Sequence, residues 1–307
     1  MNIGIIGRSE ILYDSCLKLH EQGHNIVFII TAKEAPEYRV SSDDFEKLAS
    51  EIGADFIYAP KIKNVHDNLK EYNNLDIGVS YNYVDIINQE TIDLFKLGIL
   101  NAHGGDLPRY RGNACQAWAI LNKENRVGLC IHKMIGSELD SGDIIERDYL
   151  SINENTKITQ IHEWMNLRVP ELFIESLKKL KKDNHYILEV QSKKNEDILR
   201  TYPRRPEDGK INWSQNSEEI IRLINATNKP YSGAFTFFEK KKVIIWDAEA
   251  VKDNEKFLAI PGQVTNILKK SIYVSSGDGK IKVNLVEIDG EEFHPNEIIK
   301  SIRARFT

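Results

Sequence analysis

The sequence predicts an α/β protein with a doubly wound, mostly parallel sheet, followed by a smaller antiparallel β domain. Two observations predict it. Through the first half, short apolar runs such as "NIGIIG" (2–7) and "NIVFIIT" (25–31) alternate with helical patterns, as in a parallel sheet covered by helices on both faces. Past residue 200, the long helical patterns give way to short alternating runs typical of antiparallel strands.

The elements of the first half follow in order. Strands are expected at 2–7, 25–31, 55–60, 76–81 and 98–103, with helices over 9–22, 42–52, 64–72 and 88–95. Two later strands, 127–134 and 143–152, precede a long helix over about 157–182, in which Pro170 is a point where the helix can kink. Ligands of doubly wound sheets bind outside the carboxyl ends of the strands, so polar residues there are the first candidates for a site.

The second part of the chain begins with the Pro-rich, charged stretch "RTYPRRPEDGKINW", which runs from residue 200 to residue 213. A short helix over 217–228 follows, and then strands at 233–239, 241–251, 262–267, 271–276 and 279–288. Strands of this length and spacing predict an open, OB-like barrel. We therefore expect two domains, residues 1–200 and residues 201–307.

Composition limits the class of protein. Of 307 residues, 41% are hydrophobic and 28% charged, and no apolar stretch reaches the length of about 18–20 residues that crosses a bilayer. The first residues carry no basic region or cleavage site, so we expect no signal peptide and no membrane partner. Three scattered cysteines, Cys16, Cys115 and Cys130, favour neither a disulfide framework nor a metal site and fit a cytoplasmic protein.

The charge pattern indicates a small substrate rather than nucleic acid. The net charge is −5, and residues 201–307 hold 17 Lys and Arg against 15 Asp and Glu. Neither domain has the strongly basic character typical of nucleic-acid binding. A dinucleotide site is also not expected, because "GIIGRSEI" lacks the third glycine of that motif.

Three polar residues form a candidate catalytic set. Asn101 and His103 share one face of a strand at its carboxyl end, in "ILNAHGGDLPRYRG", and Asp140 follows in "ELDSGDII". Alone, an Asn-x-His is more often a turn with a satisfied histidine, and an Asp beside Ser-Gly is more often a turn former. Together they offer an oxyanion donor, a group that moves protons and a carboxylate. With no Ser or Cys in a nucleophile elbow, they favour direct acyl transfer to an amine.

These residues lie in recognisable motifs. "NAHGGDLPRYRGNACQAWAI" followed by "CIHKMIGSELDSGDII" resembles the catalytic core of the formyltransferases that use 10-formyltetrahydrofolate. The family signature is Asn-x-His, Leu-Pro-x-Tyr/Trp-Arg-Gly and a later Asp-x-Gly. "RRPEDGKINW" and "NKPYSGAFTFF" resemble the family's linker and C-terminal domain. The likeness is greatest to the nucleotide-sugar N-formyltransferases, which are relatives of methionyl-tRNA formyltransferase.

The resemblance implies roles for these residues. Asn101 would donate to the formyl oxygen. His103 would take the proton of the attacking amine or stabilise the tetrahedral intermediate, with Asp140 supporting it electrostatically. The pterin of the co-substrate 10-formyltetrahydrofolate would lie along backbone groups of two loops, for which the residues are Tyr83, Val84, Asp85, Ile86, Gly136, Leu139 and Asp140.

One departure from the family lies beside the histidine. Many relatives have His-Pro-Ser-Leu-Leu-Pro, whereas this chain has Gly104, Gly105 and Asp106 after His103. Two glycines are expected to open space and expose backbone N–H groups to a different acceptor. Asp106 would either hold a substrate ammonium group or cap the loop.

Three residues of the second domain are candidate substrate contacts. Arg204 and Arg205 would pair with a diphosphate, or form surface ion pairs with the neighbouring Glu207 and Asp208. Tyr231 would stack on a base or sugar, or serve only in packing.

The family formylates initiator methionyl-tRNA, glycinamide ribonucleotide or nucleotide-linked amino sugars. Relatives that act on tRNA carry a basic insertion after the second strand, but the matching stretch here, 31–44, has two basic and four acidic residues. Glycinamide ribonucleotide enzymes are usually a single domain. The sequence therefore favours a nucleoside-diphosphate amino sugar, with a place in O-antigen lipopolysaccharide biosynthesis and a homodimer as one option for its assembly. The alternatives are methionyl-tRNA formyltransferase, formyltetrahydrofolate hydrolase and a non-catalytic binding module.

Overall fold

The computed structural model describes residues 1–307, which divide into two compact units. The first comprises 1–115, 127–150 and 162–202, and the second comprises 116–126, 151–161 and 203–307. Since two short segments of the first half group with the second unit, we retain the boundary near residue 200 as a proposal. No helix in the structure is both long and apolar enough to span a membrane.

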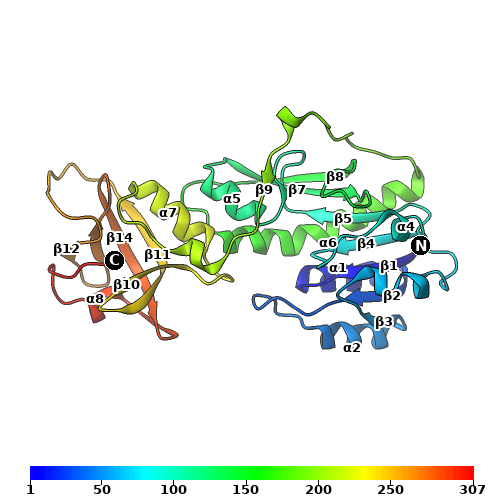
Figure 1. The fold of residues 1–307 in the computed structure, drawn as a ribbon, viewed down its shortest axis with the longest axis horizontal. Helices are drawn as coiled ribbons and strands as arrows, with labels where there is room; N and C mark the ends of the chain where they lie inside the picture. Colours follow the sequence, from blue (N-terminus) through cyan, green and yellow to red (C-terminus); the bar gives the residue numbers. More distant parts are fainter. The chain divides into compact units, whose positions relative to one another are not determined.

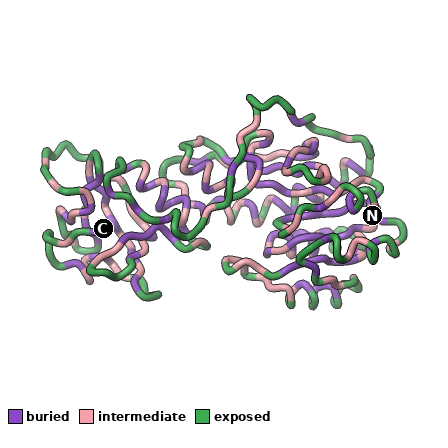
Figure 2. Tube along the Cα trace, in the orientation of Figure 1, coloured by how far each residue is buried: buried purple, intermediate pink, exposed green.

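The first unit contains a seven-stranded sheet with the order β3-β2-β1-β4-β5-β7-β8 (Figure 1). Its strands are β1 (Asn2–Gly7), β2 (Asn25–Thr31), β3 (Asp55–Tyr58), β4 (Ile77–Tyr81), β5 (Ile99–His103), β7 (Arg126–Lys133) and β8 (Ile144–Ser151). The first five are parallel, and β7 runs antiparallel to β5. The central strands are buried (Figure 2), as their apolar sequences require. The predicted doubly wound, mostly parallel sheet is confirmed.

The helices agree less evenly with the prediction. The helices are α1 (Glu10–Glu21), α2 (Ser42–Ile52), α3 (His66–Leu69), α4 (Gln89–Ile92), α5 (Cys115–Leu121) and α6 (Ile158–Lys182), with 3₁₀ turns η1 (Ile62–Asn64) and η2 (Asn195–Asp197). α2 begins at a capping box on Ser41 and ends at the left-handed Gly53, as its sequence indicates. The expected helices over 64–72 and 88–95 are single turns, α5 was not predicted, and α6 continues through Pro170.

The second unit holds an antiparallel sheet with the order β10-β11-β14-β13-β12, and β15 pairs with β14. The elements are η3 (Pro206–Gly209), α7 (Ser217–Ala226), β10 (Ala234–Phe238), β11 (Lys241–Val251), β12 (Val264–Ile267), β13 (Ile272–Ser275), β14 (Lys280–Ile288), β15 (Glu291–Phe293) and α8 (Pro295–Ile298). The two end strands are bridged by residues 304–307. Thr307 exchanges backbone hydrogen bonds with Phe237 of β10, and Phe306 donates to Gly262 just before β12. The expected antiparallel domain is confirmed.

Candidate active site

The carboxyl end of β5 carries the first two predicted site residues. Asn101 and His103 face β7, in which their register partners are His132 and Cys130. Asp140 lies in the loop that joins β7 to β8 and has a left-handed backbone with φ 52°. The antiparallel pairing of β5 with β7 and the path of this loop bring Asn101, His103 and Asp140 together, although Asp140 comes 37 positions after His103 in the sequence.

His103 and Asp140 form a buried ion pair. The Nδ1 atom of His103 lies 3.5 Å from Oδ2 of Asp140, and both side chains are less than a tenth exposed. Burial would lower the pKa of His103, but the Asp140 carboxylate and the Cys115 sulfur raise it to about 10. Burial would raise the pKa of Asp140, but His103 and His132 hold it well below its usual range. At neutral pH the pair is therefore an imidazolium beside a carboxylate.

The other ring nitrogen of His103 is held by the main chain. Nε2 donates to the carbonyl oxygen of Tyr110 at 2.6 Å, which fixes a proton on that nitrogen because a carbonyl can only accept. Tyr110 has a positive φ of 59°, an uncommon backbone conformation for a bulky residue, and it turns this carbonyl towards the ring. The thiol of Cys115 also donates to the Tyr110 carbonyl, at 3.0 Å.

Asn101 is oriented by a second histidine. Its Nδ2 lies 3.2 Å from Nε2 of His132, whose Nδ1 donates to the Lys133 carbonyl at 2.9 Å. Nε2 of His132 therefore faces the Asn101 amide, which carries two N–H groups. The second amide N–H of Asn101 is then available to a ligand. His132 also lies 3.6 Å from Asp140, so it connects the two predicted residues.

A short parallel pair of strands fixes the loop that follows β5. β6 (Arg111–Gly112) pairs with β9 (Arg200–Thr201), and the backbone N–H of Gly112 donates to Asp140 Oδ2 at 2.9 Å. Arg111 reaches the side chain of Gln191 with Nη2 at 2.7 Å. The loop that supplies the Tyr110 carbonyl is thus tied to the catalytic-site carboxylate on one side and to residues 191–201 on the other.

The two loops proposed to hold a pterin lie against each other. The Ser137 N–H donates to the Ile87 carbonyl at 3.4 Å, and the Gly136 N–H donates to the Gln89 side chain at 2.8 Å. The side chains of the first loop are engaged internally, because Tyr83 donates to the Ala59 carbonyl and Asp85 pairs with Lys61 at 3.0 Å. Recognition by this loop would therefore use its backbone.

In this loop the exposed side chains are those of Val84 and Ile86. Leu139 and Asp140 follow Gly136 in the second loop, in which only the Asp140 carboxylate contacts His103. Binding of a pterin by these residues stays a prediction.

Gly104, Gly105 and Asp106, which depart from the family pattern after His103, were expected to open space beside the histidine, and the structure shows a different role for Gly105. A Cβ on Gly105 would lie 2.6 Å from Nε2 of His103 and 2.5 Å from the Tyr110 carbonyl oxygen. The expectation of open space at Gly105 is therefore wrong, since the imidazole and the backbone fill it. Gly104 is also buried.

Asp106 is already paired within the protein. Its Oδ1 accepts from Nη1 of Arg147 at 2.6 Å and from the Tyr149 hydroxyl at 3.1 Å. Arg147 also donates to the Leu107 carbonyl at 2.7 Å, so the pair fixes the loop after β5. Of the two roles expected for Asp106, this geometry favours holding the loop over binding an ammonium group.

The candidate substrate contacts of the second domain belong to the second unit. The Arg204 guanidinium lies 5.1 Å from the ring centre of Trp118 and donates to the Asp208 carbonyl at 2.9 Å. The Arg205 backbone N–H donates to the Asp208 carboxylate at 2.7 Å. The backbone N–H of Tyr231 donates to the Asn228 carbonyl. Their roles towards a substrate stay predictions.

Several residues of this site were not found from the sequence. His132, Tyr110, Cys115 and Thr201 all contact the His103 group, directly or through one neighbour. His132 had a usable signal, because it faces the same direction as Cys130 along β7 and lies eight residues before Asp140. The contacts of Cys115 and Thr201 depend on the loop path and have no such signal.

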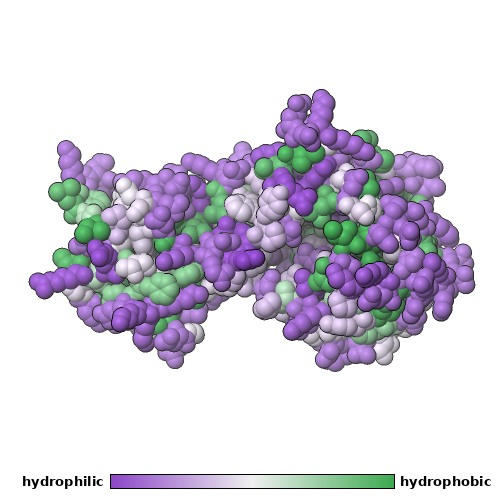
Figure 3. All heavy atoms as spheres, viewed as in Figure 1, coloured by the Kyte–Doolittle hydropathy of each residue, from purple (hydrophilic) through white to green (hydrophobic).

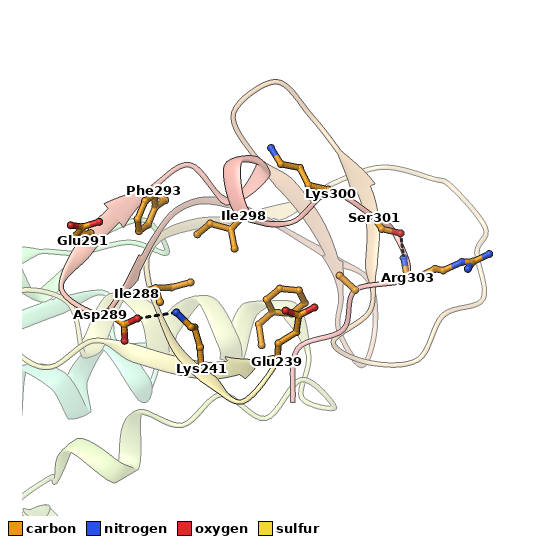
Figure 4. A pocket seen from close by; sticks show the side chains of 12 residues that line it. Glu239, Lys241, Ile288, Asp289, Glu291, Phe293, Ile298, Lys300, Ser301 and Arg303 are labelled. Carbon is orange, nitrogen blue, oxygen red and sulfur yellow. Dashed lines mark hydrogen bonds and ion pairs between the residues drawn. The ribbon is translucent and has the colours of Figure 1, made fainter.

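A separate hollow of about 710 Å³ lies within the second unit (Figure 4). It is lined by Phe238, Glu239, Lys241, Ile288, Asp289, Glu291, Phe293, Ile298, Lys300, Ser301, Arg303 and Ala304. Lys241 is paired with Asp289 at 3.1 Å. Because acidic and basic side chains are equally represented, the lining favours neither an anion nor a cation. Hydrophilic side chains predominate on the face drawn in Figure 3.

The comparisons with known proteins agree with the site. The model of the formyl transferase family matches residues 1–177, and the model of the formyl transferase C-terminal domain matches residues 204–303. The chain therefore belongs to the formyl transferase family and is an enzyme of that class. The recognition made from the Asn-x-His and Asp-x-Gly motifs is confirmed.

Individual relatives differ in their acceptors. Methionyl-tRNA formyltransferase of Malacoplasma penetrans is 29% identical over 294 residues, which cover 94% of this chain and 89% of that protein. The structure of WlaRD, a sugar 3N-formyl transferase with dTDP and 5-N-formyl-THF, has a TM-score of 0.69 and 18% identity, covering 95% of this chain and 98% of that one. An N-formyltransferase from Helicobacter canadensis, in complex with folinic acid and dTDP-3-aminofucose, has a TM-score of 0.67 and 18% identity, covering 92% and 98%.

A longer protein also shares the fold. HypX from Aquifex aeolicus, in complex with tetrahydrofolic acid, has a TM-score of 0.63 and 16% identity over 98% of this chain. The chain spans 47% of HypX, about half its length. In this chain, no group of three or more His, Cys, Asp or Glu side chains is arranged to hold a metal ion.

Proposed function

We propose that this enzyme transfers a formyl group from 10-formyltetrahydrofolate to the amine of a nucleoside-diphosphate amino sugar. The observation that carries the transfer step is the meeting of Asn101, His103 and Asp140 at the end of β5. These residues fit a formyl donor, because an amide N–H and a positive imidazolium can together stabilise the negative charge that develops on a formyl oxygen. The folate supplies the activated formyl group.

Each residue has a defined part in the proposed reaction. The acceptor amine attacks the formyl carbon directly, and Asn101 donates its second amide N–H to the formyl oxygen. Collapse of the tetrahedral intermediate breaks the bond between the formyl carbon and N10, and tetrahydrofolate leaves with a proton on N10 in exchange for the one that the amine loses. His103 stabilises the oxyanion with its positive charge, which the raised pKa of about 10 maintains at neutral pH. Of the two roles inferred from the resemblance, this protonation state favours stabilisation of the intermediate over acceptance of the amine proton. Asp140 keeps the imidazole charged and oriented.

Three observations support the sugar as acceptor. Two structural neighbours that are covered over 98% of their length are named as sugar N-formyl transferases or bound to a dTDP-linked aminosugar. The segment between β2 and α2 is acidic, and its Arg39 is paired with Glu10 at 3.6 Å. The second domain has almost no net charge.

The three buried, free cysteines support a cytoplasmic location.

Methionyl-tRNA is the second candidate acceptor, and the sequence relatives favour it. The Malacoplasma penetrans enzyme is 29% identical over 94% of this chain, which exceeds the 18% identity of the sugar-modifying neighbours. A tRNA acceptor would require several phosphate contacts, for which residues 31–44 provide little free positive charge.

The test compares both acceptors under matched salt. We expect tetrahydrofolate release with a panel of nucleotide-linked amino sugars and negligible kcat/KM for methionyl-tRNA. A tRNA enzyme making 6–10 phosphate contacts would lose about 10³–10⁵ in affinity between about 50 and 200 mM salt, whereas a diphosphate held by one or two arginines gives a shallow dependence. A preference for methionyl-tRNA with a steep salt slope would overturn the sugar assignment.

Two controls address the donor and the hydrolase alternative. We expect 10-formyltetrahydrofolate, and not 5-formyltetrahydrofolate, to support turnover. Release of free formate at the full rate without an amine would identify a hydrolase. Absence of turnover with every acceptor and with water would identify a non-catalytic binding module.

A further inference from the structure

The thiol of Cys115 is the one nucleophilic group that contacts His103, and the proposed reaction does not use it. Its Sγ lies 3.6 Å from Nε2 of His103, and the S–H donates to the carbonyls of Tyr110 at 3.0 Å and Gly112 at 3.4 Å. Cys115 is only 4% exposed. The thiol therefore belongs to the immediate surroundings of the imidazole.

The Tyr110 carbonyl receives two donors. His103 Nε2 reaches it at 2.6 Å and the Cys115 thiol at 3.0 Å, and a carbonyl oxygen has two lone pairs with which to accept both. Tyr110 holds a left-handed backbone, which a bulky residue adopts only where its surroundings impose it. The thiol is one of the contacts that impose it, so it helps to keep the carbonyl directed at the ring.

A third side chain fixes the thiol itself. Thr201 Oγ1 lies 3.4 Å from Cys115 Sγ and donates to the Arg111 carbonyl at 3.2 Å. Pairing of β6 with β9 holds Thr201 at this position. The sulfur is thus fixed between the imidazole, two backbone carbonyls and a hydroxyl. With its S–H directed at two backbone carbonyls and its side chain buried, Cys115 is placed for packing and hydrogen bonding.

We propose that Cys115 is a positioning residue for His103. Its thiol holds the Tyr110 carbonyl against Nε2, which keeps a proton on that nitrogen and turns Nδ1 towards Asp140. The imidazole then enters the catalytic cycle protonated and in one orientation. The kinetic part of this inference depends on the proposed formyl transfer, whereas the structural part does not.

The groups that face His103 define what its titration reports. Asp140 lies 3.5 Å away, the His132 ring centre lies 6.3 Å away with the rings at 81°, and Cys115 faces Nε2. Arg111 interacts with Asp140 and acts on the pair from the β6 side. Apart from Cys115, the proposed variants leave all of these groups in place.

The test measures the titration of His103 directly. Protein labelled with ¹⁵N-histidine gives ring-nitrogen signals for eight histidines, of which that of His103 is identified by its absence in His103→Asn. In Cys115→Ala we expect the pKa of His103 to fall by about one unit and a population with the proton on Nδ1 alone to form at high pH. In Cys115→Ser, a hydroxyl donor restores the contact with Tyr110, so most of the shift should be rescued.

Kinetics provide the second readout. We expect Cys115→Ala to lower kcat about tenfold and to move the alkaline limb of the pH–rate profile to lower pH, with KM for the folate donor changed by less than about twofold. Cys16→Ala is the matched control, because Cys16 is fully buried in α1 and is not among the groups that shift the pKa of His103. Cys16→Ala also removes a buried sulfur atom, but one far from the site in sequence, and it should leave the titration of His103 and the pH–rate profile unchanged.

Four outcomes would overturn the proposal. One is a wild-type His103 titration in Cys115→Ala, and another is an equal shift in Cys16→Ala, which would make the effect one of general packing. A third is formylation of Cys115, seen as an added formyl mass after incubation with donor alone, which would make the thiol a nucleophile. The fourth applies if Cys115→Ala does not fold: a pKa of His103 in Cys115→Ser that is lowered by the full unit expected for the alanine variant. Because the ¹⁵N titration needs no substrate, failure of the proposed formyl transfer would leave its result intact.

Discussion

The surroundings of His103 raise the pKa of its imidazole and favour the charged ring at neutral pH. Its two nitrogens face a carboxylate and a carbonyl, which both accept hydrogen bonds and both favour the protonated ring. A base that accepts the proton of an attacking amine must begin neutral, and both of these contacts favour the charged ring. They therefore support the proposed role of His103 in stabilising the oxyanion.

The ion pair predicts how stability depends on pH. The pKa of His103 is about 10 in the folded chain against 6.5 for an unperturbed histidine. The native state binds a proton that the unfolded state has released between these values, so stability falls as pH rises from 6.5 to 10, by at most about 1.4 kcal/mol per pH unit. Urea unfolding at pH 6.5 and 9.5 should show a smaller difference between wild type and His103→Asn at the higher pH. An equal difference at both values would contradict the raised pKa.

Substitution of either Asn101 or His103 should lower the rate of transfer. Asn101→Ala removes one oxyanion donor and should lower kcat by about 10²–10³. His103→Asn should lower the rate by at least about 10²–10⁴, with donor binding little changed. Steady-state kinetics with 10-formyltetrahydrofolate and the preferred acceptor measure both. Near-normal turnover of the His103 variant would remove this residue from the mechanism.

At the scale of elements, the loop between β5 and β6 is packed too tightly for a side chain at Gly105. In Gly105→Ala the new Cβ would meet His103 and the backbone of Tyr110 at about the distance where atoms cannot coexist, 2.5–2.6 Å. We expect the imidazole to be displaced and kcat to fall by about tenfold or more, since small misplacements at reacting groups are costly.

Gly290→Ala is the control for this substitution. Gly290 has φ +86°, and a Cβ added there would have no atom within 4 Å, so only backbone strain of about 1 kcal/mol is expected. Circular dichroism and kcat of both variants distinguish the two effects. Full activity of Gly105→Ala would show that the imidazole can move without loss of function.

The sequence was sufficient for most of the elements and for the expectation that Asn101, His103 and Asp140 lie together. Apolar runs between helical patterns located β1, β2, β4 and β5 to within one residue. Short helices were overestimated, because 64–72 and 88–95 have helical patterns but only one turn is stabilised by packing in each case. α5 was missed because its seven residues follow a loop without a recognisable start signal.

The site was predictable where residues share a strand and unpredictable where they meet across loops. Asn101 and His103 are two positions apart along β5, so strand geometry predicts that their side chains point to the same face of the sheet. The contacts of Tyr110, Cys115 and Asp106 depend on the path of a loop with a left-handed residue, which no periodicity encodes. The family motif identified Asp140, but it did not reveal that His132 joins it to Asn101.

At the scale of the whole molecule, each of the two units has buried apolar clusters of its own. Phe28, Leu69 and Ile99 belong to one cluster of the first unit, and Ile281 and Val283 belong to a cluster of the second. Separate apolar clusters predict that the chain unfolds in more than one transition.

A core substitution tests this expectation and the proposed division near residue 200. Ile281 is fully buried in β14, so Ile281→Ala should cost about 2–5 kcal/mol. Differential scanning calorimetry should show one transition moving to lower temperature while the other is retained. A single transition that shifts as a whole would indicate that the two proposed domains unfold cooperatively.

The partner of His103 Nε2 is a peptide carbonyl, and this has a consequence for how the enzyme tolerates mutation. Every amino acid has a main-chain carbonyl oxygen, so the contact does not require a particular side chain at position 110. Replacement of Tyr110 by Asn or Gly, both of which adopt a left-handed backbone readily, should preserve the contact although the aromatic side chain is lost. Because the Tyr110 side chain is buried and belongs to the Leu-Pro-x-Tyr/Trp-Arg-Gly motif, such variants should lose stability in urea unfolding while the ring-nitrogen titration of His103 stays close to that of the wild type.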